Sequence, residues 1–362
     1  MPAYIARRIA IAVPLLVAVL FASFSLLYLL PGDPTHVLLG QHWTEEAAER
    51  IRVEEGLNDP LHVQFSRYLR DLVIHGDLGT DLQKNAVDKQ IATRLPATIE
   101  LGVFAMIIAS IVGVTAGVIS ATQPRGWRDL FVLSGALAGV SIPIFWLALI
   151  AQRLFRTDGI VADTLGWDSG LPLGGRLSES FAQQIDQAIL QAQVLSDGPL
   201  NATGFLVIDS LFVFRDPAMF GDVLLHLLLP AIVLSTVPTA MITRVTRAAV
   251  GEELGKDYMR TAIAKGVRFR HVITRHVLRN AAIPIVTSIG TQLGYLMGGA
   301  VLTETIFNWP GMGTFIVNAI LQEDVRPLQA GVLVIASAFI VINLLVDISY
   351  AWLDPRVRMV AE

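Results

Sequence analysis

The sequence contains no cysteine, and charged residues make up only 16% of its 362 positions. The absence of cysteine excludes a disulfide framework, a thiolate zinc site and a cysteine nucleophile. None of the seven histidines belongs to a His-Glu-x-x-His pair, so nothing supports a metalloprotease. The formal net charge of −4 gives no indication of nucleic-acid binding. We therefore expect no metal site, no catalytic residues and no nucleic-acid partner.

A phosphate-binding loop is also missing. Such a loop requires Gly-x-x-x-x-Gly-Lys-Ser/Thr, in which the final hydroxyl binds magnesium. The nearest segment runs from Gly251 through Gly255-Lys256 to Asp257, which makes it one residue short and places a carboxylate where the hydroxyl belongs. The sequence therefore predicts no cofactor in this chain, and any use of ATP and Mg²⁺ would require partner subunits.

Apolar residues, by contrast, make up 53% of the chain and gather in six long segments. About 20 helical residues cross the roughly 30 Å hydrocarbon core of a bilayer. Helix is favoured over strand because each helix satisfies its own backbone hydrogen bonds in a medium without water. The sequence predicts an all-α integral membrane protein with about six transmembrane helices, at residues 9–30, 98–121, 130–151, 223–242, 282–302 and 330–351.

The distribution of lysine and arginine predicts the orientation. If the N-terminus is cytoplasmic, the inner segments hold 15 of the 27 basic residues in 66 positions, and the outer loops hold 12 in 165 positions. Cytoplasmic loops of membrane proteins are enriched in basic residues. We therefore expect both termini and residues 243–281 on the cytoplasmic side, with an outer insertion at 157–222.

The fifth predicted span carries three glycines at four-residue spacing, Gly290, Gly294 and Gly298. Small residues on one helix face let neighbouring helices approach closely in lipid, so we expect a helix-packing or partner face. The same helix has a set of polar side chains that could line a pathway or bond to neighbouring helices. They are Thr287, Ser288, Thr291, Gln292 and Tyr295.

The inner loop 243–281 predicts two short helices with a break between them. Residues 252–265 favour a helix, and Gly266 is a plausible left-handed stop. After it, Phe269, Val272, Ile273 and Val277 recur at helical spacing among arginines, which indicates a basic amphipathic helix at the inner membrane surface. The loop is expected to form a compact projection into the cytoplasm. From the residues alone, a solvated basic loop held to anionic lipid is an equal alternative.

Several motifs resemble those of a known family. The sequence of this inner loop resembles the EAA loop of ABC-importer permeases, in the branch that handles peptides and nickel. It departs from the general family pattern at Arg260 and Thr261, where Glu and Ala are usual. The loop residues that carry the resemblance are Asp257, Tyr258, Arg260, Thr261, Ala262, Ala264, Lys265 and Gly266. Further matching runs are 29–34, 56–60, 76–80, 94–98, 226–230, 298–304 with 309–311, and 343–347 with 353–356.

The resemblance implies a type I ABC importer (MetI-like) permease fold and a transport subunit that is not itself an enzyme. It divides the chain into an N-terminal helix with an outer loop (1–97) and a permease core of five transmembrane helices (98–362). The loop residues named above would form the coupling helix that docks on an ATP-binding subunit. The implied partners are a homologous second permease, two ATP-binding subunits, an extracytoplasmic solute-binding protein, a peptide substrate and the lipid bilayer of a prokaryotic inner membrane.

Three alternatives remain open from the sequence. The same architecture could import nickel or an oligosaccharide in place of di- or oligopeptides. A secondary transporter would normally place ion-coupling carboxylates near the bilayer midplane, often in two repeats, whereas Glu100, His226 and Asp347 all lie near the ends of their spans. An intramembrane enzyme would need a paired catalytic motif in the spans, and the sequence has none.

Overall fold

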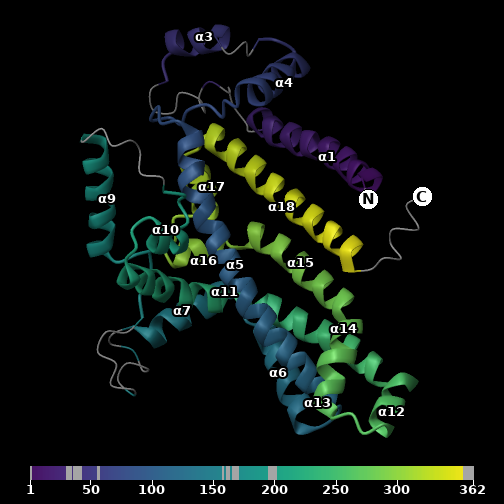
Figure 1. The fold of residues 1–362 in the computed structure, drawn as a ribbon. Helices are drawn as coiled ribbons and strands as arrows, with labels where there is room; N and C mark the ends of the chain where they lie inside the picture. Colours follow the sequence, from purple (N-terminus) through teal and green to yellow (C-terminus); the bar gives the residue numbers. More distant parts are fainter. Residues whose placement is uncertain are drawn as a thin grey trace.

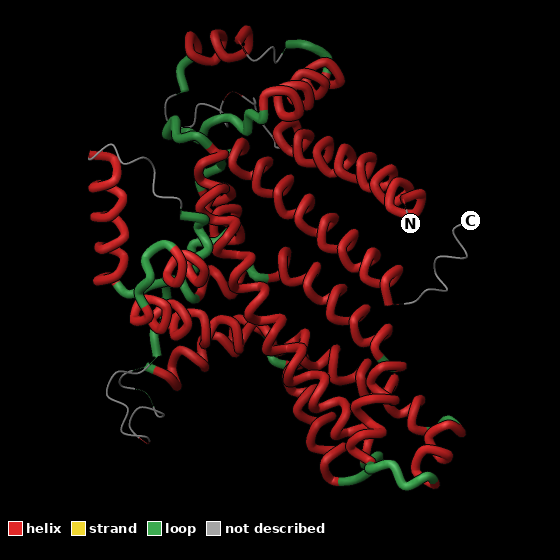
Figure 2. Tube along the Cα trace, viewed as in Figure 1, coloured by secondary structure: helices red, strands yellow, loops and turns green. Residues whose placement is uncertain are grey.

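The computed structural model describes residues 2–29, 43–54, 58–156, 171–194 and 202–353, together with the single positions 35, 159 and 164. The described residues form helices and no strand (Figure 2), apart from one isolated bridge between Thr80 and Ala86. The predicted all-α class is confirmed. Helix α1 spans Pro2–Leu29, and α3 (Glu45–Glu54) and α4 (Leu61–Arg70), which continues into a π-helical turn (Asp71–His75), follow it.

The central feature is a pair of long helices, α5 (Val87–Thr122) and α11 (Pro217–Leu254), which share the most extensive helix–helix contact. Two glycines on α5 make the close approach possible. A Cβ added at Gly113 would lie 2.9 Å from Ile242 Cβ, and one added at Gly117 would lie 2.6 Å from Thr246 Cβ. Because packed cores cannot absorb such overlaps without strain, glycine is required at both contacts.

The remaining helices lie along the sides of this pair and beyond its two ends (Figure 1). In the sequence, the helices between α5 and α11 are α6 (Trp127–Ser141), α7 (Ile144–Phe155), α9 (Glu179–Val194) and α10 (Leu206–Phe212). After α11 come α12 (Asp257–Ala264), α13 (Phe269–Val272), a π-helical turn (Ile273–Val277) and α14 (Leu278–Asn280). The chain ends with α15 (Ala282–Gly299), α16 (Val301–Ile306), α17 (Met312–Leu321) and α18 (Val325–Leu353).

Three described helices are long and apolar enough to cross a membrane: α5, α11 and residues 325–346 of α18. The predicted third span, residues 130–151, is not a single helix, because α6 and α7 meet at a bend of 103°. Pro143 has no N–H to donate and favours extended backbone at Ile142, which has φ −82° and ψ 122°. Counted as one span, the bent pair makes a fourth.

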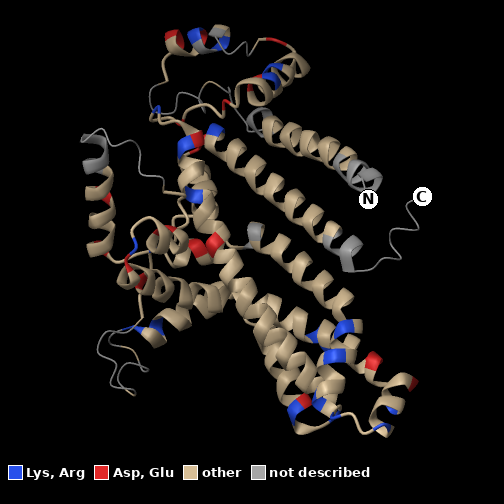
Figure 3. Cartoon of the chain, in the orientation of Figure 1, with Lys and Arg blue, Asp and Glu red and all other residues tan. Residues whose placement is uncertain are grey.

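The other two predicted spans coincide with α1 and α15. The described apolar part of α1, Ala10–Ser25, is shorter than a full crossing, and α15 has 18 residues. The total of about six therefore stays a prediction. Figure 3 shows charged residues near α3 and α4, near α12 and α13, around α7, α9 and α10, and beside α16, with few along the middle of α15 and α18.

The three glycines of α15 do not share one environment. A Cβ at Gly290 would overlap the side chain of Val346 on α18, and one at Gly294 would lie 3.1 Å from the Phe339 ring, but one at Gly298 would meet no atom of the described chain within 4 Å. At 3.6 residues per turn, each four-residue step rotates about 40° around the helix. Within the described chain, Gly290 and Gly294 therefore contact α18 and Gly298 does not, and a packing or partner role for Gly298 stays a prediction.

This difference predicts opposite effects of the same substitution. Gly290→Ala should destabilise the protein by about 1–3 kcal/mol through overpacking against Val346. Gly298→Ala should be neutral or slightly stabilising, because alanine is favoured over glycine inside helices. The midpoints of thermal unfolding in detergent would measure both. Equal midpoints for the two variants would contradict the assigned α15–α18 contact.

Candidate functional site

The loop expected to couple the chain to a partner forms a compact projection, here called the knob (residues 255–281), at one end of α5 and α11. Figure 1 places it at the opposite end of α5 from the helices α3 and α4. The predicted helix over 252–265 is in fact interrupted. Helix α11 continues to Leu254, and α12 begins after the turn at Gly255 and Lys256, where Lys256 is extended with ψ 150°. The predicted left-handed stop is present, since Gly266 has φ +76°.

The apolar face of the second knob helix packs against the protein itself. Val272, Ile273 and Val277 are buried together with Met259 of α12. This cluster includes residues near the ends of α5 and α11 and the start of α15, among them Ala121, Val250 and Ile285. The arginines at 268, 270, 275 and 279 are exposed. The predicted amphipathic pattern is present, but three of its four apolar residues are covered by protein, and only Phe269 is exposed, at 50%.

A polar link also holds the knob to α11. The Glu253 carboxylate accepts hydrogen bonds from Lys256 Nζ and Tyr258 Oη, each at 2.5 Å, and Asn280 Nδ2 donates to Tyr258 Oη at 3.0 Å. Burial and the bond to Glu253 raise the pKa of Tyr258, and the bond to Glu253 raises the pKa of Lys256. At neutral pH the phenol therefore stays a donor and the ammonium stays charged. Glu253 lies outside the predicted coupling residues, because the local sequence gives no sign that its carboxylate binds Lys256 and Tyr258.

The predicted coupling residues divide into two groups. Ala262 is half-buried against the apolar cluster, and Tyr258 belongs to the polar link. The others lie on the exposed outer surface of the knob, as does Ile263, which is 52% exposed. The exposed predicted residues are Asp257, Arg260, Thr261, Ala264, Lys265 and Gly266. The knob, packed and hydrogen-bonded to the ends of α5, α11 and α15, thus presents an exposed helix that a protein partner could contact.

A buried polar layer lies along the bundle away from the knob, where two of the sequence motifs meet. Glu304 is fully buried, and its carboxylate accepts hydrogen bonds from Thr98 Oγ1 at 2.6 Å and from the backbone N–H groups of Gly313 and Thr314. A Cβ at Gly311 would overlap this carboxylate. The Trp-Pro-Gly turn therefore needs its glycine so that the chain can close over Glu304.

The same contact joins α5 to the segment after α16. Trp309 Nε1 donates to the carbonyl of Ala97 at 2.9 Å, and the N–H of Met312 donates to Thr98 Oγ1 at 2.7 Å. Thr98 thus both accepts and donates, which satisfies two buried groups with one hydroxyl. The sequence contained both motifs, but their contact joins residues more than 200 positions apart.

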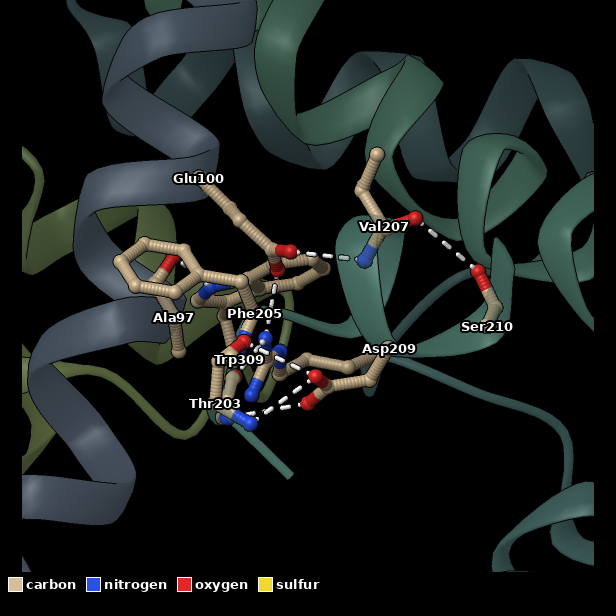
Figure 4. A network of polar contacts seen from close by, with 10 residues as sticks. Ala97, Glu100, Thr203, Phe205, Val207, Asp209, Ser210 and Trp309 are labelled. Atoms are coloured by element: carbon tan, nitrogen blue, oxygen red, sulfur yellow. Dashed lines mark hydrogen bonds and ion pairs between the residues drawn. The ribbon is translucent and has the colours of Figure 1, made fainter. Parts of the chain in front are cut away.

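A second carboxylate holds the described part of the segment between α7 and α11 on α5 (Figure 4). Glu100 is paired with Arg176 and accepts a hydrogen bond from the N–H of Val207 at 2.8 Å. Arg176 also donates to the carbonyl of Gly204 at 3.0 Å and lies 5.8 Å from the centroid of the Trp309 ring. Charge pairing and hydrogen bonding offset the cost of burying both groups. The described parts of the insertion are therefore attached to the bundle.

The polar residues of α15 do not converge on one surface. Thr291 and Tyr295 are exposed, Thr287 and Gln292 are half-buried, and Ser288 is buried. The hydroxyls of Thr287 and Thr291 donate to backbone carbonyls one turn earlier in the same helix. Tyr295 makes an edge contact with Phe339 of α18. Among these residues, Thr291 and Tyr295 offer polar groups to the outside of the chain, so a lining role stays a prediction for them.

Comparison with known proteins decides the family. The profile of the binding-protein-dependent transport system inner membrane component matches residues 113–359, and the profile of the N-terminal region of such membrane components matches residues 1–102. The chain belongs to this family. It is a permease subunit of an inner-membrane transport system, which confirms the resemblance seen in the sequence. The coarser prediction of a multi-pass inner-membrane protein is confirmed with it.

Similar proteins cover the permease from end to end. It is 41% identical to the dipeptide transport system permease protein DppB of Alkalihalophilus pseudofirmus, over 99% of this chain and 100% of the relative. It is 37% identical to the dipeptide permease of Escherichia coli over 98% of each chain. The di/tripeptide permease of Pseudomonas aeruginosa is 39% identical over 99% of each chain.

The buried layer predicts a strong effect of one small substitution. Thr98→Val keeps the shape of the side chain but removes one of the three hydrogen bonds to Glu304 and takes the acceptor from the buried N–H of Met312. This loss should lower the free energy of unfolding by about 1–3 kcal/mol. Thr98→Ser retains the hydroxyl and should cost less. Thermal unfolding in detergent compares the two variants. If valine and serine are equally tolerated, the hydroxyl is not the link described here.

Proposed function

We propose that this permease forms half of the translocation pathway of an ATP-driven importer of dipeptides and short oligopeptides. The observation that carries the proposal is full-length similarity to permeases named for dipeptide transport. Nothing in the chain favours nickel or an oligosaccharide as cargo, and the family membership argues against a transporter driven by an ion gradient alone. The second half of the pathway would be a homologous permease.

The knob is proposed to be the contact for one of two ATP-binding subunits. Its support is the combination of an exposed α12 with a stem that is tied to α5, α11 and α15 by buried apolar contacts. A force applied to α12 would therefore reach three helices of the bundle without first deforming a flexible loop. A solute-binding protein would deliver the peptide on the opposite side of the membrane.

Uptake by the reconstituted transporter tests the cargo. The permease would be purified with its partner subunits, placed in liposomes and supplied with its binding protein, labelled dipeptide and ATP. ATP-dependent dipeptide uptake is the expected result. Nickel or an oligosaccharide as the transported solute, or uptake driven by an ion gradient without ATP, would overturn the proposal.

The coupling role predicts that changes in the knob separate ATP hydrolysis from transport. Gly266→Pro cannot adopt φ +76°, because proline holds φ near −65°, and Ala262→Arg places a charge against the apolar cluster. Both should reduce dipeptide uptake by about tenfold or more while ATP hydrolysis continues, by analogy with the loss of a few kcal/mol of coupling free energy. Gly251→Ala is a matched control, since a Cβ there meets no other atom within 4 Å. Normal uptake by both knob variants would show that the knob is not the coupling element.

The proposed orientation places the knob and both termini in the cytoplasm, consistent with the enrichment of basic residues there. Because the chain has no cysteine, Lys265→Cys introduces a single thiol in it. In intact cells this thiol should resist a membrane-impermeant maleimide and should react after permeabilisation. Val53→Cys on α3, at a side chain that is 69% exposed, is the control expected to react from outside. The reverse pattern would invert the topology.

A further inference from the structure

Helix α6 is attached to the bundle in an unusual way. Among its fifteen residues, only Asp129 is buried. The large apolar side chains of α6 point outward, with Trp127, Leu130 and Phe131 each at least 68% exposed. Apolar burial within this chain therefore contributes little to holding the first half of the α6–α7 pair in place.

Asp129 supplies the attachment instead. Its carboxylate forms a bidentate pair with Arg247 of α11, through Nε at 2.7 Å and Nη2 at 2.8 Å. It also accepts a hydrogen bond from the hydroxyl of Ser120 on α5 and one from the N–H of Arg125 at 2.8 Å. Arg125 has φ +63°, a conformation that costs free energy for a non-glycine residue and is held here by that bond. We call these four residues the α6 clamp.

The clamp is built on the same helix ends that support the knob. Arg247 lies about two turns before the end of α11, beside Ala249 and Val250 of the knob cluster. Ser120 lies next to Ala121, which belongs to the same cluster. The bidentate geometry fixes direction as well as distance, because the guanidinium fork matches the carboxylate plane. Any displacement of these helix ends is therefore imposed on the start of α6.

The far end of the bent pair is held differently. Ala148 and Ala151 of α7 pack with Leu229 of α11 and with Phe307, which follows α16 and lies beside the Glu304 layer. The pair thus has a polar attachment near the knob, an apolar attachment nearer the middle of the bundle, and an elbow at Ile142 and Pro143 between them.

We infer that Asp129 is a positioning residue for transport: by binding Arg247 and Ser120 it makes α6 move with the knob and passes that motion to the α6–α7 elbow. This inference rests on the proposed coupling role of the knob. The clamp would be a second connection by which motion of the knob reaches the bundle, besides the apolar cluster. The Asp129–Arg247 pair belongs neither to the exposed knob surface nor to the buried polar layer around Glu304.

Activity measurements test the clamp in the assembled, reconstituted transporter. Asp129→Asn and Arg247→Lys remove the bidentate pair with little change in size, and each should lower the number of dipeptides imported per ATP hydrolysed by about threefold or more, within the range known for residues that modulate coupling. The double variant should be no worse than either single variant, since both remove one interaction. Arg244→Lys, at an exposed arginine about one turn earlier on α11, is the matched control. An unchanged ratio in both single variants would overturn the inference.

A distance measurement provides a readout that a purely structural role would not move. Spin labels at Leu137→Cys on α6 and at Thr274→Cys, an exposed knob position outside the predicted coupling residues, report whether the two move as one body. The chain has no native cysteine to interfere. In the otherwise unchanged chain, the distance should stay constant between the nucleotide-free and ATP-bound states. With Arg247→Lys it should change or broaden on ATP binding. If the distance between the labels changes on ATP binding equally in the chain with Arg247 and in the Arg247→Lys variant, or stays constant in both, the inference is refuted. This test does not depend on whether Asp129→Asn assembles.

The two proposals fail in distinguishable ways. If Gly266→Pro uncouples transport but the clamp variants do not, only the role of Asp129 is wrong. If Gly266→Pro and Ala262→Arg leave uptake unchanged, the coupling role of the knob is wrong, and the clamp inference that rests on it falls as well.

Discussion

The close packing of α5 against α11 is the contact on which the other features depend. Gly113 and Gly117 let the two backbones approach, because a side chain at either position would overlap Ile242 or Thr246. In lipid there is little hydrophobic gain from bringing two helices together, so close van der Waals contact has to provide the association. The pair then serves as a frame: the knob, the α6 clamp and the Glu304 layer are all attached to it.

Charge is used sparingly, and each buried carboxylate described here has dedicated partners. Glu304 is satisfied by a hydroxyl and two backbone N–H groups, Glu100 by an arginine and a backbone N–H, and Asp129 by a bidentate arginine. Each of these three carboxylates has at least one partner more than 100 positions away in the sequence. Because an unpaired charge in a medium of low dielectric constant is very costly, these pairs act as specific joints between elements that apolar packing alone would leave free to slide.

The interior of the knob explains why its residues cannot be assigned one common role. Motif similarity groups Tyr258 and Ala262 with Arg260 and Lys265, yet the first two hold the knob together and the last two lie on its surface. A conservative change at Tyr258 would therefore act on the shape of the knob, whereas a change at Arg260 would act on whatever binds it. The same distinction applies to Gly290 and Gly298 on α15.

The sequence by itself determined the helical class, the placement of the long apolar helices, the left-handed stop at Gly266 and the family, because these depend on local composition, spacing and motif text. The bend at Pro143 is also encoded locally, because proline favours extended backbone at the residue before it, although residues 130–151 were predicted as one span. Tertiary structure decided the break between α11 and α12 at Gly255 and Lys256, the covering of most of the apolar side of the second knob helix, and the pairing of Thr98 with Glu304 and of Asp129 with Arg247. Those outcomes depend on which neighbour satisfies a given group. The sequence does not show whether a carboxylate such as that of Asp129 contacts water, a lipid headgroup or an arginine 118 positions away.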